Sequence, residues 1–525
     1  MAHFSEHARL RAEIAQVRLR RGEARHAFAM RVHDRRSTIP RTRCSRRHLR
    51  NAGRQGAKRQ LAAPARVTCA GSRNCISNRM ARASPTRATI GWHAAWAMAV
   101  GGMIGGGIYT LAGVILGRAG PLAWLSLLLG SVIALVTVRS YIALTLEIAQ
   151  DGVPVSLLVR QQRYRLASIL SFSLFVVYVL ATGVYAYTFG QYVGRALGLP
   201  PSLFVWLVVG LIALLVAVNL LGIREPARLQ IAAVWIELAV LVALAIVGFV
   251  RWNPENLVEG VPTGSVGGVV TGMAATFIAF EGFEMIAYDA RELRHPRAVL
   301  TRALPAAIVA VAIAYALVTV GAASLVGAST LVEQKENALA VAGEHAAGPA
   351  GLIIVTIAAC ASAASAINAT LFSAPRLARS AAESRLVPSF LARTNRRGCP
   401  YWGVLLLGAS AAALAAMASL EPLVEAGSLA FLLLFAFVNA LAFREATSKR
   451  VIPLAGALGS LGAAIIVTRS LALSHPRALV GFVGALACCV LAWLWRSARR
   501  RARGEPPPRD DPAVKRSREA VIDGL

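Results

Sequence analysis

Apolar and polar residues are distributed along this chain in long blocks. From residue 92 onward, runs of roughly 20 mostly apolar residues are separated by short polar segments. A run of this length crosses the hydrocarbon core of a bilayer as one α-helix. We therefore expect an all-α integral membrane protein with about 12 transmembrane helices. They are expected near 92–116, 121–148, 166–194, 202–221, 229–250, 265–290, 302–327, 347–373, 402–419, 422–443, 452–469 and 476–496.

The composition agrees with this assignment. The 525 residues are 56% hydrophobic and only 16% charged, and the mean hydropathy is +0.57. These values are too apolar for a soluble protein of this size. We expect one membrane domain over residues 89–497 and a disordered cytoplasmic tail over 498–525, which leaves no room for a large soluble domain.

The net charge of +30 is concentrated at the N-terminus. Residues 1–87 contain 22 Arg or Lys against four acids and show no sustained apolar periodicity. We expect residues 1–88 to form a basic, disordered tail. Met80, shortly before the first span, is an alternative start. Arginine runs can bind nucleic acid or anionic lipid, but no specific nucleic-acid ligand is expected here.

The loop charges predict the orientation of the chain. Basic residues gather in the connections that lie on the cytoplasmic side if both termini are cytoplasmic, and the opposite connections are richer in acids. This is the positive-inside bias. We therefore expect a multi-pass protein of the cytoplasmic membrane with both termini inside. The exceptions, predicted to lie outside, are Arg118, Arg195, Arg251, Arg469 and Arg477.

Two of the expected spans are interrupted. The first contains Gly105-Gly106-Gly107, and the sixth contains Glu281-Gly282-Phe283-Glu284. Glycine favours local unwinding, and carboxylates at membrane depth usually face a cavity. Secondary transporters build midplane substrate sites from such broken helices. The alternatives are close helix packing at the glycines and pairing of Glu281 or Glu284 with an arginine.

Motifs for other chemistry are missing from the sequence. The seven cysteines include no CxxC pair with metal-ligand spacing, and the chain has no HExxH, P-loop or nucleophile-elbow pattern. We expect no catalytic residue, no metal and no cofactor. An enzyme is therefore not expected, and neither is ATP-driven transport by this chain alone.

The two interrupted segments resemble the amino acid/polyamine/organocation permeases. Met103-Ile104-Gly105-Gly106-Gly107-Ile108-Tyr109 is similar to the first-helix pattern of that family. The run from Phe280 to Glu284, followed by Ala290-Arg291-Glu292-Leu293-Arg294-His295-Pro296-Arg297, is similar to its sixth helix and exit loop. The loop from Pro375 to Trp402 is a third match, so the resemblance covers roughly 90–470.

The resemblance implies a fold of five plus five inverted helices, with helices 1 and 6 broken and two helices added at the C-terminus. It implies that a substrate carboxylate meets backbone N–H groups around Gly105, Gly106 and Gly107. The substrate amine would meet carbonyls freed near Ile104, Phe280 and Glu281, and Gly282 completes the group. Phe280 corresponds to an aromatic gate, or else is an ordinary core phenylalanine.

The fifth helix departs from the family pattern. Many members carry there a lysine implicated in proton coupling, and the matching residue is Glu237. Buried carboxylates also serve as proton carriers in transporters. Glu237, Glu281 and Glu284 are therefore the candidates for proton coupling. Glu237 can alternatively hold a structural hydrogen bond or contact a cationic substrate.

These observations lead to one interpretation of function. We expect secondary active transport of amino acids or related amines by alternating access, with protons as the coupling ion and membrane lipid as the surroundings. The alternatives are an amino acid exchanger and, less favoured, a membrane nutrient sensor that transports nothing. The sequence favours neutral or apolar amino acids slightly and leaves the direction of transport and the oligomeric state open.

Overall fold

The computed structural model describes residues 90–105, 107–148, 153–222, 227–288, 290–445 and 450–502. The contacts within the chain divide it into two units, Met1–Arg82 and Ala83–Leu525. All described residues belong to the second unit. The predicted basic tail over residues 1–88 lies outside the described residues, as does Met80.

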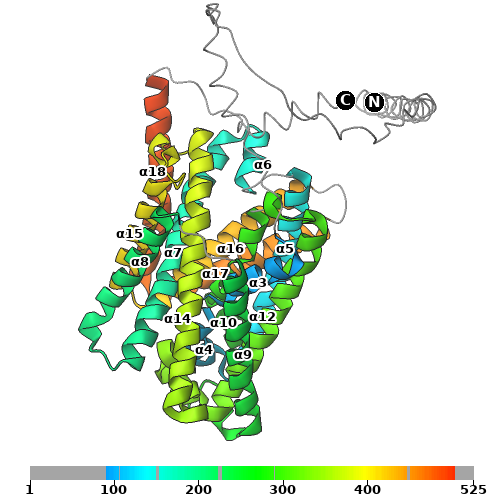
Figure 1. Cartoon of the computed structure of the whole chain (residues 1–525). Helices are drawn as coiled ribbons and strands as arrows, with labels where there is room; N and C mark the ends of the chain where they lie inside the picture. Colours follow the sequence, from blue (N-terminus) through cyan, green and yellow to red (C-terminus); the bar gives the residue numbers. More distant parts are fainter. Residues whose placement is uncertain are drawn as a thin grey trace, which may run out of the picture. The chain divides into compact units, whose positions relative to one another are not determined.

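The described residues form helices joined by short connections (Figure 1). The α-helices are α3 (Trp92–Ile104), α4 (Gly107–Ala119), α5 (Ala123–Ile148), α6 (Val155–Arg160), α7 (Tyr164–Ala196), α8 (Phe204–Leu220), α9 (Ala227–Val250), α10 (Val266–Ala275), α11 (Phe283–Tyr288), α12 (Pro296–Val326), α13 (Ala328–Glu333), α14 (Ala338–Glu383), α15 (Tyr401–Met417), α16 (Leu420–Glu445), α17 (Val451–Ser474) and α18 (Pro476–Ala502). Single 3-10 turns are η1 (Gly120–Leu122), η2 (Pro201–Leu203), η3 (Glu255–Leu257), η4 (Phe277–Phe280), η5 (Ala290–Glu292), η6 (Lys335–Asn337) and η7 (Ser389–Ala392).

Each of the twelve predicted spans overlaps one of these helices or a broken pair of them. Judged by length and apolarity, nine helices among the described residues can cross a membrane, or ten when a bent pair is counted as one span. The smaller number arises because α3 has only 13 residues, α4 is continuous with α5 over Gly107–Glu147, and α15 has only 17 residues. The prediction of an all-α membrane protein is confirmed.

Two boundaries differ from the prediction. The eighth span was expected at 347–373, whereas α14 begins at Ala338 and is interrupted at Ala347 and Gly348, where Gly348 has φ +64°. Pro349 then starts the longer part, where its fixed φ suits a first helical turn. α18 continues through Ala502, so residues 498–502, expected in the disordered tail, are helical.

The broken spans lie inside the helical unit. α3 packs against α9, α11 and α12, and α12 also packs against α5. α7 packs along α14 and α15, while α8 lies against α15. Figure 1 shows α8, α15 and α18 along one side of the unit and α9 and α12 along the other. The breaks are therefore enclosed by other helices, which is the condition for tolerating unwound backbone at membrane depth.

Candidate functional site

The first span breaks at Gly105. α3 ends at Ile104, and the Gly105 N–H still donates to the Gly101 carbonyl at 3.0 Å. Gly105 has φ +35°, a region that residues with a Cβ adopt rarely. Gly106 lies outside the described residues, and α4 begins again at Gly107. α4 therefore begins in the interior of the protein. The N–H groups of its first turn favour a negatively charged group at this point.

The sixth span breaks in two steps. α10 ends at Ala275, and the following segment to Tyr288 turns away by 60°. Glu281 is extended, and Gly282 has φ +113°. The Gly282 N–H donates to Oε2 of Glu284 at 2.9 Å. The ion pairs among the described residues include neither Glu281 nor Glu284, so those pairs do not bear out the alternative of pairing with an arginine.

The two breaks contact one another through glycine. A Cβ on Gly282 would lie 2.5 Å from the carbonyl carbon of Gly102, closer than such atoms approach. On one side of this contact the backbones of Ile90 and Glu292 also pair, with the Ile90 N–H 3.1 Å from the Glu292 carbonyl oxygen. The interrupted parts of spans one and six are therefore held together as one unit.

Tyr315 of α12 lies between the two breaks, and the sequence analysis missed it. Its hydroxyl is 2.8 Å from the Met103 carbonyl oxygen and 3.2 Å from that of Ala279. The Tyr315 side chain is fully buried. A single hydroxyl donates to one of these carbonyls at a time, so the other is available to another donor. One tyrosine in an apolar span gives no signal of this position.

Glu281 is buried beside the first break, with 1% of its surface exposed. Its Oε2 accepts a hydrogen bond from the Tyr185 hydroxyl of α7. Its Oε1 has no hydrogen-bond partner among the described residues. Tyr185 also lies against Gly105, since a Cβ there would be 3.2 Å from the Tyr185 ring. Tyr185 thus connects the carboxylate of span six to the break in span one.

Glu237 of α9 approaches the same region. It is 5% exposed, and its Oε1 has no hydrogen-bond partner among the described residues. It lies within electrostatic range of the hydroxyls of Tyr109 and Tyr315. Tyr315 is also within range of Glu281. Two buried carboxylates, one on α9 and one in the break of span six, therefore act electrostatically on the Tyr315 hydroxyl.

The ring of Phe280 faces α5 and α12. A Cβ on Gly130 of α5 would be 2.9 Å from the ring, and the centroids of Phe280 and Tyr315 are 5.9 Å apart. Ile278 faces α16 instead, and its backbone N–H donates a hydrogen bond to Oγ of Ser428 at 3.0 Å. The contacts described for the Phe280 ring therefore join it to α5 and α12.

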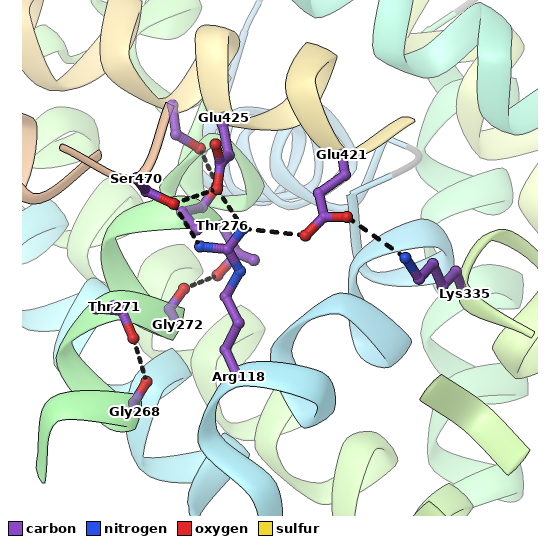
Figure 2. A network of polar contacts seen from close by, with 11 residues as sticks. Arg118, Gly268, Thr271, Gly272, Thr276, Lys335, Glu421, Glu425 and Ser470 are labelled. Carbon is purple, nitrogen blue, oxygen red and sulfur yellow. Dashed lines mark hydrogen bonds and ion pairs between the residues drawn. The ribbon is translucent and has the colours of Figure 1, made fainter. Parts of the chain in front are cut away.

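A polar network holds the far end of α4 (Figure 2). Arg118 contacts Glu425 of α16 and also lies 3.1 Å from Glu421 and from Ser470 of α17. Lys335 of η6 approaches Glu421 at 3.4 Å. Glu425 is fully buried, whereas Lys335 and Glu421 are partly exposed. The network ties the second half of span one to three other elements.

The arrangement offers complementary groups for a small zwitterion. N–H groups at the start of α4 suit a carboxylate, and carbonyls next to Tyr315 together with Glu281 suit an amine. Every described candidate residue is buried: Ile104, Gly105, Gly107, Glu237, Phe280, Glu281, Gly282 and Glu284. Among the described residues, three or more His, Cys, Asp or Glu side chains nowhere gather as metal ligands.

Comparison with known proteins places the chain in a family. The sequence model of the family described as "Amino acid permease" matches residues 90–501. The inner membrane transport protein YbaT of Escherichia coli is 26% identical over 395 residues, covering 74% of this chain and 91% of that protein. L-asparagine permease 2 of Mycobacterium bovis is 28% identical over 329 residues, covering 59% and 66%.

A solved structure supports the fold. A manganese transporter of Eremococcus coleocola superposes with a TM-score of 0.53 at 12% identity, covering 78% of this chain and 94% of that one. At this identity the likeness concerns the fold alone. The chain therefore belongs to the amino acid permease family and is a membrane transporter rather than an enzyme.

Proposed function

We propose that this permease carries amino acids or related amines across the cytoplasmic membrane by proton-coupled symport. The observation that carries the proposal is the contact of two broken helices at Gly102 and Gly282. Tyr315 and Glu281 lie beside the backbone groups that the breaks leave outside regular helix. The names of relatives such as L-asparagine permease 2 agree with this substrate class.

The substrate is proposed to bind with its two charged ends on the two breaks. Its carboxylate would receive N–H groups around Gly105, Gly106 and Gly107, at the positive end of the α4 dipole. Its ammonium would lie toward Glu281 and the carbonyls near Ile104 and Phe280. The Tyr315 hydroxyl donates to one of the Met103 and Ala279 carbonyls at a time, so an ammonium would take the other.

Proton coupling is proposed to use Glu281 or Glu237, with Glu284 as a third candidate. A buried carboxylate lacking a cationic partner is costly as an anion, so it favours taking up a proton. Glu281 has one oxygen bonded to Tyr185 and one without a partner among the described residues, and it adjoins the proposed amine position. Its protonation state would therefore influence how strongly an ammonium binds.

The transport cycle is proposed to require release of the network around Arg118. Alternating access in transporters of this kind moves one group of helices against another around a central site. α4 leads away from the site and ends in the contacts of Arg118 with α16 and α17. In this proposal these contacts close the predicted outer side when they are formed, so opening that side needs their separation.

Uptake by proteoliposomes tests the proposal. Purified full-length protein is given a labelled amino acid panel with and without an inward-acid pH gradient, and Glu281→Gln, Glu237→Gln and the exposed control Glu147→Gln are compared. We expect accumulation that collapses with the gradient, falls at least tenfold in Glu281→Gln or Glu237→Gln, and persists in Glu147→Gln. A tenfold loss corresponds to about 1.4 kcal/mol.

Two results would replace the proposal. Uptake that needs internal amino acid and ignores the gradient makes the protein an exchanger. Substrate binding without flux makes it a sensor. The exchanger is the second candidate because Glu237 and Glu281 can also serve as fixed contacts for an ammonium, without releasing protons.

A further inference from the structure

A basic cavity lies away from the candidate substrate site. It has a volume of about 520 Å³ and is enclosed by the end of α8, the last part of α14 and the segment that leads into α15. Among the described residues that line it, three are arginines, Arg376, Arg379 and Arg397, and one is an acid, Glu383. The described part of the lining therefore carries more positive than negative charge.

The arginines are held in place by their own contacts. Nη1 of Arg397 donates to the Leu221 carbonyl oxygen at 2.5 Å, and Nε of Arg379 donates to Glu383 at 2.7 Å. The guanidinium of Arg376 lies 3.2 Å above the centroid of the Phe372 ring. A guanidinium has five N–H donors, and the bonds described for Arg397 and Arg379 use one each. Donors therefore remain for a ligand.

The segment that carries Arg397 is itself ordered by hydrogen bonds. Asn395 accepts the backbone N–H groups of Arg397 and Cys399 at 2.9 and 3.0 Å. Its side-chain amide donates to the Leu220 carbonyl at 2.8 Å. The turn is thereby fixed to the end of α8, so Arg397 is positioned before any ligand arrives.

The charge and geometry suit a phosphate. Arginines gathered around one cavity create a positive potential that attracts anions. Guanidinium groups bind phosphate oxygens in a paired, bidentate manner, which makes arginine the preferred residue for phosphate recognition.

The residues around the cavity are typical of the level of lipid headgroups. α15 begins with Tyr401 and Trp402, and Trp402 is 38% exposed. Aromatic residues of this kind mark the membrane interface. Beyond them α15 exposes the apolar Leu405 and Leu406. Basic pockets between helices on the cytoplasmic side are suited to anionic lipid headgroups.

We propose that this cavity binds the phosphate of an anionic phospholipid headgroup, with Arg376, Arg379 and Arg397 as its ligands. The site is separate from the proposed substrate site but is connected to it through α14. Asn368 of α14 accepts a hydrogen bond from Asn219 of α8 at 2.8 Å. Two residues earlier on α14, the Ala366 methyl lies against Gly105. Bound lipid would therefore hold α8, α14 and α15 together behind the first break.

Thermal unfolding of the full-length protein in a neutral detergent tests this binding without depending on transport. The protein is measured alone, with phosphatidylglycerol, with phosphatidylcholine and with inorganic phosphate. Arg379→Gln and Arg397→Gln remove ligands, and the combination removes both. The matched control is Arg396→Gln, an exposed arginine of the same segment that does not line the cavity. Arg379 is included because its side chain bonds Glu383 and, among the described residues, no backbone carbonyl, so its replacement is not expected to disturb the fold of the segment.

We expect phosphatidylglycerol to raise the unfolding midpoint of the wild type and of Arg396→Gln, and phosphatidylcholine to leave it unchanged. The rise should be at least halved in each single variant and lost in the combination. Equal rises in all variants, or no rise with phosphatidylglycerol or phosphate, would overturn the proposal. A rise with inorganic phosphate alone, lost in the combination, would overturn the lipid assignment in favour of a soluble phosphate.

Discussion

At the scale of single residues, Gly282 meets two independent requirements. Its φ of +113° lies in a region that side chains rarely tolerate, and its Cα faces the backbone of Gly102 without space for a methyl group. The first requirement is one of conformation and the second is one of packing. If the backbone shifted to satisfy one requirement, the other would remain. A residue with a side chain therefore does not fit at this position without a larger rearrangement.

Gly282→Ala is therefore expected to destabilise the protein and abolish uptake. The conformational strain alone costs about 1–3 kcal/mol, and the contact with Gly102 would separate spans one and six. The measurements are the thermal unfolding midpoint and proteoliposome uptake. Gly462→Ala of α17 is the control, since a Cβ there meets no atom within 4 Å. Equal behaviour of the two variants would show that the contact between the breaks is unimportant.

Residue patterns predicted the breaks but not their partners. Glycines at 105–107 and the carboxylate at 281 interrupt apolar runs, so their special character is visible locally. Tyr315 is an ordinary residue of an apolar helix until folding places it 2.8 Å from the Met103 carbonyl, 212 positions away. Such contacts depend on which helices pack together, and one sequence does not specify that. The roles proposed for Glu237, Phe280 and Glu284 stay predictions.

At the scale of elements, the network at the end of α4 explains an exception to the charge pattern. Arg118 was predicted on the side that is poorer in arginine, and it pairs there with Glu425 and Glu421. Arg195 similarly approaches Glu344 at 3.3 Å, and Arg251 donates to the His345 carbonyl at 3.1 Å. These arginines are engaged by their neighbours, so the positive-inside bias of the remaining loops is not weakened by them.

Removing Arg118 is expected to cost far more than removing Arg195. Glu425 is fully buried, so Arg118→Gln leaves a buried charge without its cation, a loss of about 3–5 kcal/mol. Glu344 is 45% exposed and stays hydrated after Arg195→Gln, with an expected loss below about 1 kcal/mol. Thermal unfolding of both variants measures the difference.

A double-mutant cycle separates this pairing from simple loss of packing. Glu425→Gln combined with Arg118→Gln removes both charges, so it should recover part of the stability lost in Arg118→Gln. If the combination is as unstable as the sum of the two single changes, the charges are not coupled and the network does not hold α4 in place.

At the scale of the whole molecule, the class of the fold and the approximate positions of the spans followed from hydropathy alone. Apolar runs of bilayer length leave few alternatives to spanning helices, because unsatisfied backbone groups are prohibitive in lipid. The kink in α14 was harder to place. The helix begins at Ala338, is interrupted at Gly348 and continues from Pro349, so the span was predicted to begin only near the interruption. The side of the membrane on which each end lies is set by the charges that flank the spans.

The orientation can be tested directly with reporter fusions. Both termini are predicted to be cytoplasmic, because arginines gather on that side, including Arg376 in the last part of α14 and Arg397 in the segment that follows it. Green fluorescent protein fused to the C-terminus should therefore fluoresce, and alkaline phosphatase at the same position should be inactive. Alkaline phosphatase inserted after Glu255, between α9 and α10, should be active. The reverse pattern would put the Arg118 network on the cytoplasmic side and the basic cavity on the outer side, where anionic headgroups are scarcer, and the lipid proposal would lose its physical basis.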